Sequence, residues 1–247
     1  FGNDEEVTGV GAQLAVAAFT ERGIRPWAVV DEGGAVVSGM FPGVPGQIAV
    51  VGLAEKGSLN VELVTTDPGG HAASPVPGGA PARLAKAILA VDAQPFPARL
   101  NDVVRGMVDA AGRHAPTPLR AVFANADGLG PVLATVLSRA GREANALVRT
   151  TVAVTRLEGS KASNVLATTA KAHLNIRIAL GETVQSTVDR LRKAIGDESV
   201  ELRVLNGNDP SPVSRTDNDA WAKVAAAAQA RHADLSHARF RLGQQSL

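Results

Sequence analysis

The sequence predicts an α/β domain that is interrupted by an inserted α+β domain with the element order of a ferredoxin-like sandwich. A helix and a short apolar strand occupy the start of the chain, and helical periodicity returns after residue 209. Between them, the apolar pattern predicts a strand, a helix, two strands, a helix and a strand, in that order, if a helical stretch in the middle is set aside. At 247 residues the chain is long enough for two domains.

Residues 1–54 are expected to form the first part of the α/β domain. The apolar spacing of Val10 and Leu14 predicts a helix from Gly9 to Arg22 with one buried face. The short apolar run Trp27–Val30, bounded by proline and glycine, predicts a buried strand of the parallel type. In such sheets ligands gather outside the carboxyl ends of the strands, so the acids after this run are site candidates.

Residues 55–208 are expected to form the inserted α+β domain, and residues 209–247 a return to the first domain followed by a polar tail. The expected strands are Ser58–Thr66, Val148–Leu157, Ala167–Ile178 and Val200–Leu205, and the expected helices are Pro81–Val91, Val184–Ile195 and, after the insert, Ala220–Ala230. The Ala-rich stretch from Leu100 to Ala144, broken by prolines, is expected to be helical.

Composition excludes several classes of function. Lys+Arg 25 against Asp+Glu 24, scattered along the chain, leave no basic stripe for nucleic acid. No apolar stretch reaches the roughly 18 residues of a membrane-spanning helix, so we expect no membrane partner. With no cysteine, a metal ion would have to be held by carboxylates and imidazoles, and the redox compartment stays open.

Two clusters of acids, Asp4–Glu6 and Asp31–Glu32, lie before the first predicted helix and after the first predicted strand. Carboxylates so close together repel one another unless a cation or a shared proton compensates, which favours a divalent ion such as zinc or manganese. The alternative is that Glu5 and Glu6 merely complement the dipole of the helix that follows them.

Five short segments carry a resemblance to a known family. They are Phe1–Ala12, Val30–Gly34, Glu55–Ser58, Gly70–Pro75, and Ser163–Leu166 leading to Asn175–Arg177. In this order, from residue 1 to about residue 214, the chain resembles the di-zinc aminoacylase and carboxypeptidase S family, in particular the carboxypeptidase S and N-acyl amino acid hydrolase branch. The resemblance implies a partial zinc-peptidase catalytic domain with an inserted lid or dimerisation domain.

The resemblance also implies roles for the acids. Glu5 would be the general base that activates water, and Glu6 would be a zinc ligand. Asp31 or Glu32 would be the next zinc ligand, with Asp31 favoured. The intact family binds two zinc ions, which lower the pKa of water and polarise the scissile carbonyl.

Three further residues receive implied roles in the inserted domain. His71 resembles the histidine that stabilises the oxyanion, usually from the partner of a homodimer. Asn164 and Arg177 resemble the pair that positions the substrate, with a guanidinium suited to a free carboxylate. The alternative for His71 is that it is a solvated loop histidine. The alternative for Arg177 is that it is a surface residue that forms an ion pair.

Two parts of the family pattern have no counterpart. An earlier His-x-Asp motif would precede Phe1, and a later histidine ligand is missing because His232 and His237 lie in a tail without resemblance. We therefore expect a fragment of a longer enzyme with an incomplete metal site.

The function expected from the resemblance is metal-dependent hydrolysis of an N-acyl amino acid or a short peptide, with the present chain inactive or nearly so. The alternative is a non-catalytic dimerisation or binding module derived from the same family.

Overall fold

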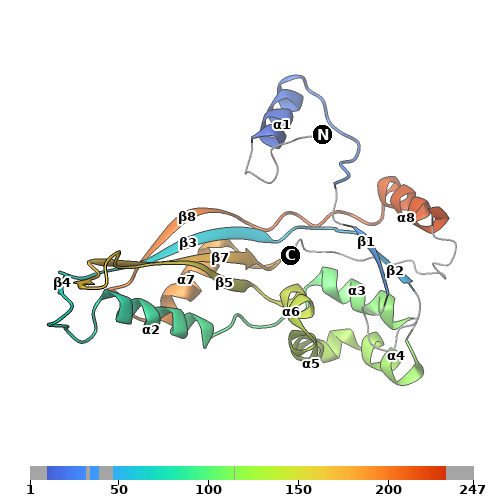
Figure 1. Ribbon diagram of the computed structural model, residues 1–247. Helices are drawn as coiled ribbons and strands as arrows, with labels where there is room; N and C mark the ends of the chain where they lie inside the picture. The colour runs from blue at the N-terminus through green and yellow to red at the C-terminus, as the bar shows by residue number, and fades with distance from the viewer. Residues whose placement is uncertain (1–9, 32–33, 39–46, 114, 232–247) are drawn as a thin grey trace.

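The computed structural model describes residues 10–31, 34–38, 47–113 and 115–231 (Figure 1). Its centre is a four-stranded antiparallel sheet with strand order β5-β7-β3-β8. The strands are β3 (Gly57–Thr66), β5 (Thr151–Glu158), β7 (Thr169–Ile178) and β8 (Glu201–Asn208). Helices α2 (Ala80–Asp92) and α7 (Val184–Ile195) lie on the same face of this sheet (Figure 1). This order and layering are those of a ferredoxin-like sandwich, so the predicted fold of the insert is confirmed.

The core of the sandwich follows from strand alternation. Every second residue of β7 is buried, and on β3 Leu59, Val61 and Leu63 are fully buried. These residues pack against one stripe of each helix. The helical side of the core consists of Leu84, Ala87 and Val91 from α2 and Val188 and Leu191 from α7.

The start of α7 is fixed by side-chain caps, because the first backbone N–H groups of a helix have no partner within it. The Thr183 hydroxyl accepts a hydrogen bond from the backbone N–H of Ser186, whose side chain in turn accepts from the N–H of Thr183. Asp209 Oδ1 accepts from the N–H of Val184 at 2.7 Å. The segment that follows β8 is thereby tied to the start of α7.

A second core lies beside the sandwich, in the helical stretch. It is built by α3 (Asp102–Gly112), α4 (Thr117–Ala124), α5 (Ala126–Arg139) and α6 (Arg142–Val148). A hairpin of β1 (Ala35–Ser38) and β2 (Gln47–Val50), which the sequence analysis did not predict, completes it (Figure 1). Ile48 is 1% exposed and packs in the same cluster as Val104 and Met107 of α3.

Two expectations for the first segment are wrong. Helix α1 (Gly11–Glu21) forms, but none of its residues is buried, so the expected buried face is absent. Residues 27–30 form no strand, and Val29 and Val30 are 84% and 78% exposed. A buried parallel strand needs paired strands at its edges and helices over its faces. In the described part of the chain no strand pairs with these residues, and α1 stands apart from the sheet (Figure 1).

Two short strands and one helix complete the described fold. Strands β4 (Gly70–His71) and β6 (Val165–Leu166) pair with each other, where a loop was expected at Gly69–His71. Helix α8 (Asp219–Arg231) follows the return segment, close to the expected range. Among the described residues, no helix is both long and apolar enough to cross a membrane. The predicted domain boundaries at residues 54 and 208 stay a prediction.

Candidate functional site

The predicted acids are only partly described. Glu5, Glu6 and Glu32 lie outside the described residues. Asp31 is described and exposed, and it follows the exposed Val29 and Val30. Within the described ranges, no three His, Cys, Asp or Glu side chains come together in a group that could hold a metal ion. The predicted donors are carboxylates, and in their chemistry they fit a hard or borderline divalent ion.

The structure brings His71 and Asn164 together from distant parts of the sequence. His71 of β4 pairs with Val165 of β6, and the backbone N–H of Ala72 donates to the carbonyl of Asn164 at 3.0 Å. Both side chains are exposed. The two residues therefore form one candidate patch beyond the end of the four-stranded sheet.

A glycine is required for this approach. Gly69 has a φ of +77°, and a Cβ at this position would lie 2.6 Å from Thr168 Cγ2. Any other residue would strain the backbone and crowd the side chain of Thr168, which lies between β6 and β7. The glycine that the sequence analysis assigned to a loop thus allows His71 to lie beside β6.

The imidazole of His71 has a defined hydrogen-bonding state. Its Nδ1 accepts a hydrogen bond from the backbone N–H of Ala73 at 3.1 Å. A neutral ring that accepts at Nδ1 carries its proton on Nε2. The exposed ring can therefore donate from Nε2 to an anionic oxygen.

Arg177 lies at the opposite end of the sheet. On β7 it pairs with Ser58 on one side and Thr151 on the other, and it is half-buried. Thr169 starts the same strand beside the His71 patch, and at about 3.3 Å per residue it lies roughly 26 Å from Arg177. If His71 and Arg177 touch the same substrate, they must belong to different chains.

A buried lysine, Lys56, lies close enough to Arg177 to be affected by its charge. The sequence analysis assigned Lys56 no role. Lys56 is 4% exposed, and its Nζ donates to the backbone carbonyl of Arg149 at 2.9 Å. Burial, aided by the charge of Arg177, lowers the pKa of Lys56 to about 8. Its family motif, Glu55–Ser58, was the only signal in the sequence that could have singled it out.

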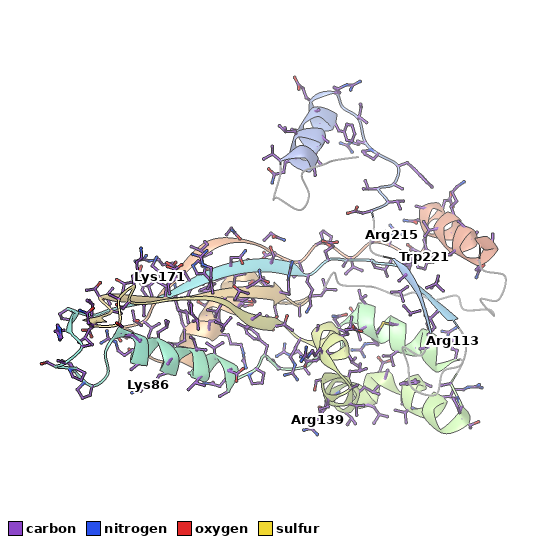
Figure 2. The ribbon with its side chains drawn as sticks, in the orientation of Figure 1. Lys86, Arg113, Arg139, Lys171, Arg215 and Trp221 are labelled. Carbon is purple, nitrogen blue, oxygen red and sulfur yellow. The ribbon has the colours of Figure 1, made fainter. Side chains whose placement is uncertain are left out.

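A second unpredicted cluster lies on the sheet face opposite the helices. The side chain of Glu62 is 9% exposed, and its oxygens lie 3.2 Å from Lys171 Nζ, 3.2 Å from His173 Nε2 and 3.7 Å from Arg203. Figure 2 shows Lys171 on this part of the sheet. Strand alternation placed Glu62 on the polar face, but it did not show that both neighbouring strands would cover it with cations.

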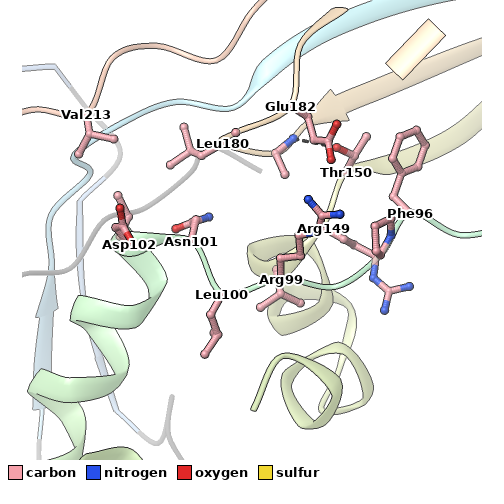
Figure 3. Close-up of a pocket in the computed structure, with 15 residues that line it drawn as sticks. Phe96, Arg99, Leu100, Asn101, Asp102, Arg149, Thr150, Leu180, Glu182 and Val213 are labelled. Carbon is pink, nitrogen blue, oxygen red and sulfur yellow. Dashed lines mark hydrogen bonds between the residues drawn. The ribbon is translucent and has the colours of Figure 1, made fainter. Parts of the chain in front are cut away.

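A pocket of about 380 Å³ lies where the helical stretch meets the sandwich (Figure 3). Its walls come from the chain before α3, the junction of α6 and β5, and the turn between β7 and α7. Arg99 and Arg149 are among the lining residues. The sequence analysis missed this pocket, because residues far apart in the chain form it.

Comparison with known proteins places the chain in a family. Residues 53–203 match the M20 family model described as a peptidase dimerisation domain. The N-fatty-acyl-amino acid synthase/hydrolase of Xenopus tropicalis is 35% identical over 218 residues, covering 87% of this chain and 42% of that protein. The probable carboxypeptidase S-like 2 of Dictyostelium discoideum is 31% identical over 220 residues, with the same two coverages of 87% and 42%. The chain thus spans less than half the length of these relatives.

Solved structures agree on the fold. Human carnosine dipeptidase 1 superimposes with a TM-score of 0.56 at 12% identity, covering 97% of this chain and 53% of that one. An M20 family metallo-carboxypeptidase of Sulfolobus solfataricus gives a TM-score of 0.55 at 17% identity, with coverages of 93% and 53%. At these identities the likeness extends to the fold alone.

Proposed function

Because this chain belongs to the M20 peptidase family, we propose that it is part of a metal-dependent amide hydrolase that acts on N-acyl amino acids or short peptides. The family itself consists of hydrolases of this general type, as the names of the relatives state. The observation that carries the proposal is the 35% identity to an N-fatty-acyl-amino acid synthase/hydrolase along 87% of this chain. That stretch spans the inserted domain that bears His71, Asn164 and Arg177.

Each residue of the inserted domain has a role that its chemistry supports. The guanidinium of Arg177, half-buried on a rigid strand, would bind the free carboxylate of the substrate. The Nε2 proton of His71 would be donated to the oxyanion that forms when water attacks the amide. Asn164, next to His71, would orient the same group.

The acids would supply the rest of the chemistry. Glu6 and Asp31, or Glu32 in its place, would hold zinc. A bound zinc ion would lower the pKa of water and polarise the carbonyl. Glu5 would accept the proton of the attacking water and pass it to the departing amine.

We propose further that the 247-residue chain on its own is inactive or nearly so. A catalytic site needs ligands held within about 0.5 Å by packed neighbours. Here the segment before Asp31 is not packed, because α1 buries no residue and Val29 and Val30 are mostly exposed. Detectable zinc-dependent hydrolysis by the purified chain would contradict this part of the proposal.

The partner would be a second copy of the chain. Edge strand β5 exposes Val154 to 42% and Leu157 to 65%, and Leu89 of α2 is 66% exposed. An apolar edge of this kind is suited to pairing with another strand edge. The separation of His71 from Arg177 supports the same arrangement.

The alternative function, a non-catalytic dimerisation module, requires the same surface but none of the polar residues.

A chimera tests the hydrolase proposal. The present chain replaces the matching segment of the Xenopus tropicalis relative, and release of amino acid from an N-acyl amino acid is measured. We expect hydrolysis that Glu5→Gln abolishes. Arg177→Met should be nearly inactive at a substrate concentration near the native KM, because its own KM is far higher, whereas the exposed Glu143→Gln on α6 should leave kcat and KM unchanged. A folded, dimeric chimera without hydrolysis would favour the non-catalytic module.

A further inference from the structure

The pocket beside α3 is lined by both charged and apolar side chains. Its volume of about 380 Å³ is at the lower end of the range for small-molecule sites, which is about 300–1,000 Å³. Arg177 is not among its lining residues, although Leu180 lines it only three positions further along the chain. The cavity is therefore separate from the carboxylate site proposed above.

Arg149 lines this cavity, and its guanidinium is incompletely hydrogen-bonded. Its Nε is buried and finds no hydrogen-bond partner within the described part of the chain. Its backbone carbonyl is already occupied by Lys56 Nζ at 2.9 Å. A guanidinium without an ion-pair partner favours an anionic acceptor beside it. Arg99 lines the same cavity (Figure 3).

The acids of the cavity do not neutralise these arginines. Glu182 Oε2 accepts a hydrogen bond from the Ser186 hydroxyl at 2.8 Å, at the start of α7. The Asp102 side chain is exposed to solvent and lies 3.9 Å from Arg105 Nε, on its own helix. No ion pair among the described residues involves Arg99 or Arg149, so both guanidinium groups are available to an anion.

Besides the polar Asn101 and Thr150, much of the remaining wall is apolar. Phe96, Val103 and Val148 are 4%, 6% and 2% exposed. Leu100, Leu180 and Val213 line the same cavity (Figure 3). An inorganic anion would leave this surface in contact with water, whereas an aliphatic chain would cover it.

We propose that this cavity binds an aliphatic carboxylate, with the carboxylate on Arg149 and Arg99 and the chain against Leu100, Leu180 and Val213. The ligand class rests on the proposed function, because hydrolysis of an N-acyl amino acid releases an aliphatic acid. The N-acyl amino acid itself carries the same two groups, a carboxylate and an aliphatic chain. The cavity is thus a second carboxylate site at the Arg177 end of the sheet.

Calorimetric titration of the 247-residue chain with octanoate tests the proposal. Octanoate should bind, and acetate and octanol, which each lack one half of the ligand, should bind at least about tenfold more weakly. Arg149→Met, which keeps the aliphatic length but removes the charge, should weaken octanoate binding about tenfold or more. Arg139→Met, at an exposed position of α5, should leave the affinity within about twofold.

A second variant makes the test independent of any effect of Arg149 on folding. Leu180→Trp fills the cavity and leaves both arginines in place, and it should weaken octanoate binding to a similar extent. Circular dichroism checks that each variant is folded. N-octanoylglycine in place of octanoate distinguishes the intact substrate from the released acid, since the tighter ligand identifies the species the cavity holds.

Several results would overturn the inference. Absence of octanoate binding, equal binding of octanol, or unchanged binding in both Arg149→Met and Leu180→Trp would each do so. Loss of binding in Arg177→Met alone would place the ligand in the substrate site instead, and it would leave the proposed function standing. The chimera's hydrolysis is measured separately, so failure of either proposal can be recognised.

Discussion

At the scale of single residues, the pKa of Lys56 lies well below the ordinary value for a lysine. Its pKa falls from 10.5 to about 8 because burial disfavours the charged ammonium and Arg177 repels it. The unfolded chain therefore binds more protons than the folded one between these two values. The contribution of Lys56 to the free energy of unfolding must rise with pH across that window.

We predict that the free energy of unfolding of the native chain, relative to Lys56→Met, rises by up to about 3 kcal/mol between pH 8 and pH 10.5. Urea unfolding at a series of pH values measures this difference. Lys86→Met, which removes an exposed lysine of α2 (Figure 2), should show no such rise. A flat difference for Lys56→Met would mean that the ammonium is not desolvated in the folded chain.

The cations around Glu62 predict a second stability effect. Glu62→Gln removes the charge that Lys171, His173 and Arg203 approach, and we expect a loss of about 1–3 kcal/mol. Glu201→Gln is a matched control, since Glu201 also pairs with Arg203 but is 55% exposed. Its loss should be clearly smaller than that of Glu62→Gln, because solvent screens surface ion pairs. Equal losses in denaturant unfolding would show that burial of Glu62 adds nothing.

At the scale of elements, local periodicity predicted what local interactions determine. Helix α7 has the predicted bounds Val184–Ile195, because its apolar stripe, its Thr183 cap and Gly196 after its end all lie within the segment. Strand β3 was predicted to within one residue by the alternation of Leu59, Val61 and Leu63. Both elements pack in the main core.

The elements that were mispredicted depend on distant partners. Residues 27–30 are apolar enough for a buried strand, but strand formation requires a neighbouring strand that the described chain does not provide. The hairpin of β1 and β2 was missed because each strand has only four residues and is stabilised by packing of Ile48 on α3. Neither partner can be inferred from the segment itself.

The helical stretch offers a test of packing between α3 and α4. A Cβ on Gly112 would lie 2.3 Å from Phe123 Cβ, whereas one on Gly128 of α5 would meet nothing within 4 Å. We predict that Gly112→Ala lowers the free energy of unfolding by about 1–3 kcal/mol through overpacking. Gly128→Ala should be neutral or stabilise by up to about 1 kcal/mol, because alanine favours the helix. Denaturant unfolding of both variants measures these changes. A free energy of unfolding that Gly112→Ala leaves unchanged would contradict the close packing.

At the scale of the whole molecule, the family resemblance named candidate site residues, whose roles stay a prediction, but it did not indicate where they lie. His71 and Asn164 are far apart in sequence, and only the pairing of β4 with β6 makes them neighbours. Their distance from Arg177 follows from the length of β7, a property of the sheet rather than of any motif. Lys56, Glu62 and the arginine-lined cavity were not predicted, because burial of a charged residue depends on tertiary packing.

We propose that, in a dimer, His71 of one chain and Arg177 of the other contact the same substrate. In the chimera, His71→Ala and Arg177→Met should each be nearly inactive alone. A mixed dimer of the two variants has one intact site, because one chain keeps Arg177 and its partner keeps His71. The most direct measurement is therefore hydrolysis after the two inactive variants are unfolded and refolded together. Our account predicts recovery of about a quarter of the native rate from random pairing. A mixture that forms dimers but stays as inactive as its components would contradict it.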